Sequence, residues 1–378
     1  MKDSGTRFPS VNTNFPKVSI VVPVYNGGRA TRKAVRSIQK QNLEEIEIIL
    51  VDDCSTDYTL SVMKELKKED KRIRIVKNKK NRGVLFSRMN GALKSKGEYV
   101  AFLDADDAFC NGGIIKDLYE EAVKEKLDLV QCDYFVGLFD GEEDMQTKML
   151  ATGANSKAYG KVLKQPEITK KFYKVLQEKK DSILPVAFGK LYSRELIEKM
   201  AKLLSSDFYK ENIIYNDDFI MVLAAAKEAK SAKLLKLGGN WHWYDNPNGR
   251  SYKTFDMTPD SKYVRPEISN KRIGDYLMTI EKAFEITEND PTSEKFRMSL
   301  FESFTKPEDH RIAIAHCDKF EIVLKLCKEF QHWEYASKEN KKKARELGAD
   351  MMGYVMDIET YKRFKYQYYM LFENKGDL

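Results

Sequence analysis

The sequence contains few of the residues that build disulfide frameworks and zinc sites. Its 378 residues include five cysteines and four histidines, without a C-x-x-C or an H-E-x-x-H pattern. The cysteines are scattered and odd in number, which favours buried free thiols in a reducing compartment. His310 and His316 are six positions apart, a poor spacing for two metal ligands on one helical face.

Long apolar runs are also missing. No stretch of about 18 uncharged apolar residues occurs, so the sequence predicts no membrane span. Residues 1–16 have no apolar signal core, and we expect a flexible leader there. These absences indicate a cytoplasmic protein, with peripheral contact at the inner face of a membrane as an alternative.

The composition is that of a globular protein with a modest basic excess. Hydrophobic residues make up 42% of the chain, which allows a sizeable core and two or three domains. The net charge of +7 suits a solvated basic surface, and also phosphorylated substrates or an anionic membrane. The sequence has no clustered basic patch or recognisable nucleic-acid module, so nucleic acid is not an expected partner.

Strand-like runs and helical periodicity alternate through the first 107 residues. Strands are expected at 17–25, 46–53, 72–76 and 98–104, and helices at 28–41, 55–70 and 83–96. Ser55 or Thr56 is the expected cap of the second helix. This alternation predicts an α/β fold with a parallel sheet covered by helices.

The pattern changes further along the chain. We expect a strand at 128–135, a loop at 136–160, a helix at 166–180, and a strand or turn leading into a helix at 186–200. After about residue 265 the pattern is mostly helical, and the Pro- and Gly-containing stretch 245–266 is the expected boundary. The predicted domains are therefore 17–255 and a helical region at 266–378.

The candidate site residues lie where the predicted strands end, and ligands bind at the carboxyl ends of such strands. These residues are Pro23, Tyr25, Asp52, Asp53, Asp104, Asp106 and Asp107. Asp104 and Asp106 can point to one side of an extended segment and hold a hard divalent cation together with substrate phosphates. As an alternative, Asp106 and Asp107 cap the next helix.

Four stretches in register resemble a known family. VSIVVPVYNGG, ILVDDCSTDYT, NRGVLFSRMNGAL and GEYVAFLDADD resemble the nucleotide-sugar domain of family 2 glycosyltransferases of the GT-A fold. The resemblance is close over 17–135, the nucleotide-sugar half, and looser over 136–255, the acceptor half. It implies a Rossmann-like, mostly parallel sheet flanked by helices. The implied activity is inverting transfer of a hexosyl or N-acetylhexosaminyl group from a nucleoside-diphosphate sugar to a glycan or lipid-linked acceptor, as in polysaccharide biosynthesis.

The resemblance also implies a donor site. Pro23, Tyr25 and Asp53 would form the nucleobase pocket, with a ring for stacking and a carboxylate that accepts from an imide N–H, a pairing that favours UDP. Arg82 and Arg88 would lie near the donor, because a guanidinium matches phosphate geometry. Arg88 has the alternative of bracing the acidic loop.

The DXD-type acids would hold the metal ion. By the resemblance, Asp106 is the expected direct ligand of Mn²⁺ or Mg²⁺, and Asp104 approaches the ribose or the metal. Asp107 is expected to support these two residues without binding the metal directly. Residues 240–251 resemble the loop that closes over the donor diphosphate. Expected contacts there are His242, Arg250 and Ser251 to phosphate, and Trp241 and Trp243 stacking on a sugar on the acceptor side.

An acidic pair opens a predicted helix within 213–229. The family's usual Glu-Asp is Asp217-Asp218 here, which makes Asp218 the expected catalytic base and Asp217 the alternative. An ordinary helix start with Asn216 as cap is the competing interpretation. Residues 186–196 resemble the segment lining the acceptor side. Gly189 replaces a frequent Asn there, and Lys190 is a candidate acceptor contact.

The tail and two other functions complete the hypotheses. Residues 266–378 suit a helical domain with a solvated basic face, or else membrane contact, acceptor contact or self-association. A sugar nucleotidyltransferase normally has a Gly-rich basic signature near its first strand, and PVYNGGRATRK lacks that pattern. A non-catalytic binding relative would be expected to lose the metal acids or the base. The Q-x-x-R-W of processive synthases is absent, so we expect one sugar to be added at a time.

Overall fold

The computed structural model describes residues 15–109, 111–132, 134–139, 148–151, 159–176, 183–237, 241–245, 266–305 and 317–353. The chain forms two compact units, Met1–Asp256 and Met257–Leu378. The division falls inside the Pro- and Gly-containing stretch 245–266.

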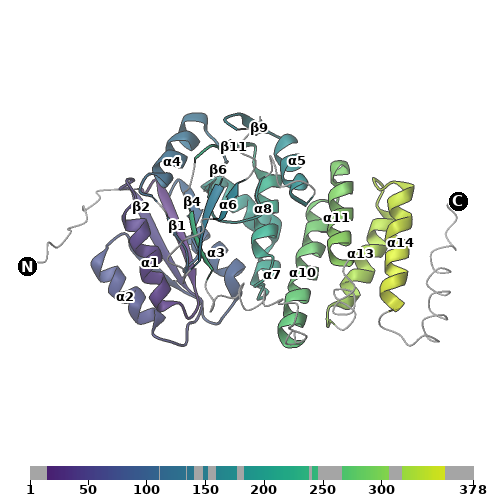
Figure 1. Cartoon of the computed structure of the whole chain (residues 1–378), viewed down its shortest axis with the longest axis horizontal. Helices are drawn as coiled ribbons and strands as arrows, with labels where there is room; N and C mark the ends of the chain where they lie inside the picture. The colour runs from purple at the N-terminus through teal and green to yellow at the C-terminus, as the bar shows by residue number, and fades with distance from the viewer. Residues whose placement is uncertain are drawn as a thin grey trace, which may run out of the picture. The chain divides into compact units, whose positions relative to one another are not determined.

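The first unit is built on an eight-stranded sheet with the order β3-β2-β1-β4-β10-β6-β11-β9 (Figure 1). The strands are β1 Val18–Val24, β2 Ile46–Asp52, β3 Ile73–Lys77, β4 Tyr99–Phe102, β6 Leu129–Cys132, β9 Val162–Lys164, β10 Lys190–Ser193 and β11 Ser231–Leu235. Strand β10 is antiparallel to both neighbours and β9 is antiparallel to β11, whereas the other four pairings are parallel. The predicted, mostly parallel α/β sheet is confirmed.

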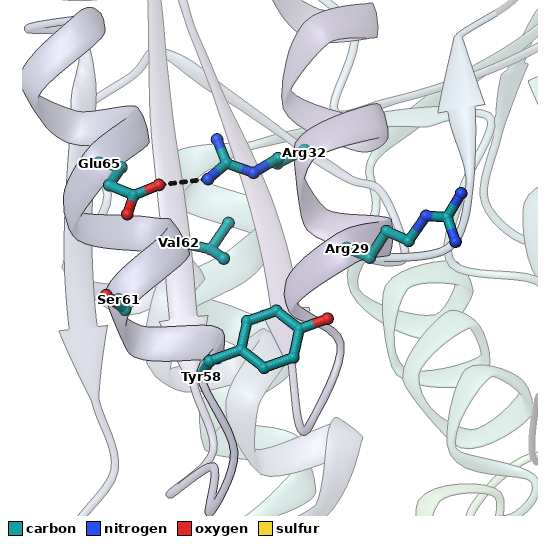
Figure 2. Close-up of a pocket in the computed structure, with 6 residues that line it drawn as sticks. All are labelled: Arg29, Arg32, Tyr58, Ser61, Val62 and Glu65. Atoms are coloured by element: carbon teal, nitrogen blue, oxygen red, sulfur yellow. Dashed lines mark hydrogen bonds and ion pairs between the residues drawn. The ribbon is translucent and has the colours of Figure 1, made fainter.

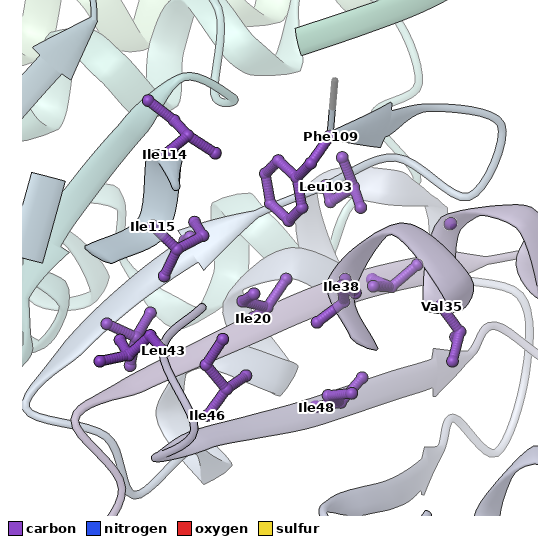
Figure 3. Close-up of a cluster of buried hydrophobic side chains, with 14 of the residues drawn as sticks. Ile20, Val35, Ile38, Leu43, Ile46, Ile48, Leu103, Phe109, Ile114 and Ile115 are labelled. Atoms are coloured by element: carbon purple, nitrogen blue, oxygen red, sulfur yellow. The ribbon is translucent and has the colours of Figure 1, made fainter. Parts of the chain in front are cut away.

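Helices cover both faces of this sheet because its strands are apolar on both sides. Alternate residues of β1 and β2 pack with α1 (Gly28–Gln39), α2 (Thr59–Glu69) and α4 (Ile114–Glu125) in the cluster of Figure 3. On the other face, α3 (Gly83–Lys94) packs on β1 and β2 and contacts α6 (Arg194–Leu204) and α8 (Asp217–Glu228). A Cβ at Gly91 would lie 2.5 Å from Val21 Cγ1, so this glycine allows α3 to approach the sheet closely.

Three local predictions need correction. The loop expected at 136–160 contains strands, because β7 (Tyr134–Phe139) and β8 (Lys148–Ala151) join β5 (Ala108–Phe109) and β12 (Trp241–Asp245) in a second sheet, β5-β12-β7-β8. The strand expected at 128–135 therefore divides between the two sheets. The helix expected at 166–180 is α5 (Glu167–Tyr173), followed by a 3₁₀ turn to Leu176.

Ser55 and Thr56 do not cap α2, which begins at Thr59. Their amides are used elsewhere: Ser55 N donates to Asp52 Oδ1 (2.9 Å) and Thr56 N donates to Asn26 Oδ1 (2.8 Å). The two hydrogen bonds tie together the segments that follow β1 and β2.

The second unit contains helices with an aromatic core. They are α10 Pro266–Ile286, the 3₁₀ turn η2 Pro291–Ser293, α11 Glu294–Thr305, α13 Phe320–His332 and α14 Lys338–Gly353. The rings of Phe284, Phe301 and Phe330 pack mutually at centroid distances of 5.0–6.1 Å. Within the described ranges, no helix of the chain is long and apolar enough to cross a membrane. The four described cysteines are free, and Cys54 differs from the prediction in being half-buried.

Candidate functional site

Several elements end or begin at one edge of the large sheet. The parallel strands β1, β2 and β4 place their carboxyl ends there, and α3 and α8 begin nearby. Strand β10 is antiparallel to β4, with Tyr192 opposite Val100 and Ser193 opposite Tyr99. The chain preceding Lys190 therefore lies at the edge where β4 continues into Asp104. This topology joins segments that are far apart in the sequence.

Asp53 directly follows β2 and lies next to the start of α3, where neutral hydrogen-bond donors hold its carboxylate. Its carboxylate accepts from Asn78 Nδ2 (2.8 Å) and from the backbone amides of Arg82 (2.9 Å) and Gly83 (2.8 Å). Burial raises the pKa of Asp53, although these hydrogen bonds oppose the rise. Gly83 has φ +84°, and a Cβ there would lie 2.7 Å from the Ile213 carbonyl oxygen, so the turn requires glycine.

The other predicted nucleobase residues lie beside Asp53. The Asp53 amide donates to the Val24 carbonyl (2.8 Å), which joins the ends of β1 and β2. Pro23 is buried in β1 opposite Val51, and Tyr25 is 39% exposed. The structure thus brings Pro23, Tyr25 and Asp53 to one place, with an aromatic ring accessible for stacking.

The two predicted arginines have different surroundings. Arg82 Nη1 donates to the Lys210 carbonyl (3.1 Å) in α7 (Ser206–Lys210), and its guanidinium lies over the Phe86 ring. Arg88 is only 3% exposed and lies at the centre of the acidic residues. The structure therefore places Arg88 in the bracing role that was the alternative to donor contact.

Arg88 joins three carboxylates from two distant segments. Nη2 contacts Asp104 Oδ1 at 2.5 Å, and Nη1 contacts Asp218 Oδ1 at 2.5 Å and also Asp217 Oδ2. Burial opposes the charged form, but the three carboxylates outweigh it and raise the pKa of Arg88 well above its usual value. The guanidinium is therefore a permanent positive charge that holds the loop after β4 against the start of α8.

Asp107 is buried without a matching donor. Its side chain is 1% exposed, and neither its Oδ1 nor the Nε of Arg88 has a hydrogen-bond partner among the described residues. Burial, with the nearby charges of Asp104 and Asp106, raises the pKa of Asp107 well above its ordinary value. More carboxyl groups are gathered here than Arg88 can pair with.

This excess of carboxylate oxygens over cationic side chains is suited to bind a hard divalent cation. No three His, Cys, Asp or Glu side chains in the described ranges are arranged to hold a metal ion by themselves. In phosphate chemistry, Mg²⁺ is usually bound by one or two protein carboxylates, and substrate phosphates complete its coordination. The unpartnered Asp107 oxygen and the surplus of carboxylates next to Asp104 and Asp106 fit such a cation.

The acidic pair occupies the first turn of α8. Asp217 is buried, whereas the side chain of Asp218 remains 26% exposed. Burial raises the pKa of both groups, with Arg88 opposing the rise. Asn216 occupies the expected N-cap position with φ +61°, but its side chain makes no capping hydrogen bond to this helix.

Lys190 is fully buried, and its Nζ donates to the Val186 carbonyl (2.6 Å). Burial lowers the pKa of Lys190 to about 7. Gly189 has φ +70°, a conformation that Asn tolerates better than most other residues. The replacement of the family's frequent Asn by glycine therefore has a backbone reason.

The segment after the acidic cluster pairs with β12. His242 lies opposite Ala108 and Trp241 opposite Phe109, directly after Asp107. The backbone of β12 therefore lies beside the loop that carries Asp104, Asp106 and Asp107. Arg250 and Ser251 lie outside the described residues, and only the backbone is described for Trp241, His242 and Trp243.

Sequence reasoning missed one contributor, Asn78, whose side-chain amide donates to Asp53. Asn78 directly follows β3, so the rule that selected Asp53 and Asp104 was able to find it.

A separate hollow lies between α1 and α2 (Figure 2). It is lined by Arg29, Arg32, Tyr58, Ser61, Val62 and Glu65. Arg32 is paired with Glu65, and the hollow contains none of the predicted site residues.

The sequence family described as Glycosyl transferase family 2 matches residues 19–201. These residues belong to glycosyltransferase family 2. The family match covers β1 to β4 and the acidic cluster, and it ends within α6.

Curated glycosyltransferases also match part of the chain. The uncharacterized glycosyltransferase EpsJ of Bacillus subtilis is 30% identical over 233 residues, which are 62% of this chain and 62% of EpsJ. A Campylobacter jejuni protein named GalNAc(5)-diNAcBac-PP-undecaprenol beta-1,3-glucosyltransferase is 40% identical over 26% of this chain and 32% of its own length. The chain thus spans less than two thirds of each relative.

A solved structure supports the fold over a longer range. S. aureus TarS 1-349 in complex with UDP-GlcNAc covers 92% of this chain and 92% of its own chain, with a TM-score of 0.56 and 18% identity. The structure of this chain therefore has the mixed α/β fold of the GT-A glycosyltransferases, followed by a helical region.

Proposed function

We propose that this protein is an inverting glycosyltransferase that uses a nucleoside-diphosphate sugar, with UDP as the favoured nucleotide. The observation that carries the proposal is the position of Asp218. It is a partly exposed carboxylate that pairs with the buried Arg88, and Arg88 in turn joins it to Asp104.

Asp218 is suited to act as the general base. Its raised pKa makes it a better proton acceptor than an ordinary aspartate, and Asp217 is more deeply buried. As the acceptor oxygen attacks the anomeric carbon, Asp218 takes the hydroxyl proton. The bond from that carbon to the diphosphate oxygen breaks on the opposite side. The products are an inverted glycoside and a nucleoside diphosphate.

Donor binding is assigned to the adjacent residues. Tyr25 offers its ring to the base, and Asp53, already held by three neutral donors, accepts from an imide N–H. Asp106 and Asp104 would hold Mn²⁺ or Mg²⁺, with Asp107 behind them. When bound, such a cation stabilises the negative charge of the departing diphosphate.

The proposals for the acceptor and the donor sugar rest on related proteins. The name of the Campylobacter relative includes an undecaprenol-linked glycan, and the TarS structure includes UDP-GlcNAc. These names support a glycan or lipid-linked acceptor and a UDP-sugar donor. Trp241, His242 and Trp243 in β12, with Arg250 and Ser251 beyond it, remain proposed contacts to sugar and phosphate.

Calorimetric titration of UDP, with GDP and CDP as controls and with or without Mn²⁺, tests the donor site. We expect UDP binding that depends on Mn²⁺ and is lost in Asp106→Ala. Asp117→Ala, at an exposed position in the first turn of α4, is the matched control. Turnover with a panel of UDP-sugars then tests transfer. UDP binding that is the same with and without Mn²⁺, and the same in Asp106→Ala, would contradict the metal assignment. Absence of nucleotide binding would contradict the proposed function.

A further inference from the structure

Helices α1 and α2 carry a concentrated excess of positive charge. Together they contain seven basic and two acidic residues, a net charge of +5 compared with +7 for the whole chain. Helix α4, which covers the same face of the sheet, contains two basic and four acidic residues. No clustered basic patch is visible in the sequence, because β2 separates α1 from α2 along the chain. The fold brings the two helices into contact and creates the patch.

The two acidic residues do not neutralise this excess, because both are already engaged. Glu65 pairs with Arg32, and Glu69 pairs with Arg36 at 2.5 Å. These pairs join the outer sides of the two helices. The other basic residues of α1 and α2 are exposed, namely Arg29, Lys33, Lys64, Lys67 and Lys68. We call the surface that carries these five cations the α1–α2 face.

An exposed aromatic ring lies in the same surface. Tyr58, directly before α2, is 61% exposed and lines the hollow between the two helices together with Arg29 (Figure 2). Tyrosine is enriched at the level of the lipid head groups, where its ring contacts apolar chains and its hydroxyl contacts water. Basic side chains at the same level are attracted to anionic phospholipids. The α1–α2 face therefore combines the two kinds of side chain that suit a membrane surface.

The α1–α2 face begins next to the proposed donor site. Helix α1 begins three residues after Tyr25, and α2 begins six residues after Asp53. Asn26 Oδ1 accepts from Thr56 N (2.8 Å), which joins the segments that lead into the two helices. A membrane bound to this face therefore reaches the carboxyl edge of the sheet, where the donor site lies.

We propose that the α1–α2 face docks this protein on a membrane of anionic phospholipids. The inference rests on the proposed function and deepens it, because a lipid-linked acceptor presents its glycan at such a surface. A planar anionic surface contacts at the same time cations that are spread over two helices. The proposal places membrane contact on α1 and α2 in place of residues 266–378.

Sedimentation of the full chain with lipid vesicles tests the proposal. We expect binding to phosphatidylcholine vesicles that contain phosphatidylglycerol, no binding to pure phosphatidylcholine vesicles, and weaker binding at high salt. Each basic residue near an anionic surface strengthens binding about fivefold, so Lys64→Gln/Lys68→Gln should weaken it about 25-fold. Lys116→Gln/Lys124→Gln is the matched control, because it removes two exposed lysines from α4 and should leave binding unchanged.

Several results overturn the proposal. They are wild-type protein that does not bind the anionic vesicles, equal binding to neutral vesicles, unchanged binding in Lys64→Gln/Lys68→Gln, and an equal loss in the α4 control. Binding to soluble heparin without binding to vesicles also overturns it, and would assign the face to a soluble polyanion.

Kinetics separate docking from the proposed function. Lys64→Gln/Lys68→Gln should keep the wild-type Kd for UDP and the wild-type turnover of a water-soluble acceptor, which also shows that the variant is folded. A wild type that binds anionic vesicles but transfers no sugar contradicts the proposed function and leaves docking in place. A wild type that transfers sugar but binds no vesicles overturns docking alone.

Discussion

Asp53 and Asp107 are both buried carboxyl groups at the same edge of the sheet, yet their surroundings differ. Asp53 accepts three hydrogen bonds from neutral donors, one from Asn78 and two from the start of α3. Asp107 has a buried oxygen without a hydrogen-bond partner among the described residues and lies near other acids. The two sites are joined by α3, which begins next to Asp53 and carries Arg88.

This difference indicates that the region around Asp53 and the region around Asp107 have different functions. A carboxylate held by three hydrogen bonds is rigid and keeps an acceptor position for one more donor group, such as a base imide. A cluster with more carboxylates than cations is unstable by itself and suited to receive a positively charged partner. The predictions below test whether the two regions can be separated experimentally.

The largest expected effect is on chemistry in the acidic region. Asp218→Asn keeps the shape of the side chain but removes the proton acceptor, so kcat should fall about 10²–10⁴-fold with an unchanged Kd for UDP. Steady-state kinetics and calorimetry measure the two quantities. Asp117→Asn, in the first turn of α4, controls for the helix start and should retain wild-type kcat. Near-normal turnover in Asp218→Asn would assign the base elsewhere.

The next effect is on stability. Arg88→Met removes the only guanidinium that contacts Asp104, Asp217 and Asp218 among the described residues, so it should lower the free energy of unfolding by about 3–5 kcal/mol. Urea unfolding measures this loss. Arg36→Met breaks an exposed pair with Glu69 and should cost no more than about 1 kcal/mol. Equal losses in the two variants would refute the bracing role of Arg88.

A smaller effect is expected on the Asp53 side. Asn78→Ala takes away one donor to Asp53 and should weaken UDP binding about tenfold, with little change in kcat at saturating donor. Exposed Asn42→Ala is a suitable control. If kcat falls as much as affinity does, the two regions do not act separately.

The smallest effect is a pH dependence of stability from Lys190. Its pKa is about 7 in the folded chain and near 10.4 when unfolded, so between these values the unfolded chain binds more protons. Stability should therefore rise with pH by about 1 kcal/mol per pH unit between pH 7 and 10, relative to Lys190→Met. Urea unfolding of both proteins across this range measures the difference. Parallel pH curves would show that the burial of Lys190 does not shift its titration.

Local patterns in the sequence were sufficient for the large sheet and for the place of the site. Strand and helix periodicity predicted the elements from Val18 to Phe102, because each apolar face is encoded by neighbouring residues. The carboxyl-end rule then selected Asp53 and Asp104 before any contact was known. The second sheet was missed, because β12 joins β5 and β7, which precede it by more than 100 positions, and no local pattern predicts such a pairing.

The sequence by itself determined the α/β architecture, the family resemblance and the acidic residues at the strand ends. Only the tertiary structure decided their partners. Arg88 and Asp217 are 129 positions apart, and no local pattern links a guanidinium in one helix to the first turn of another. The pairing depends on how α3 and α8 pack against each other, which is a property of the folded chain.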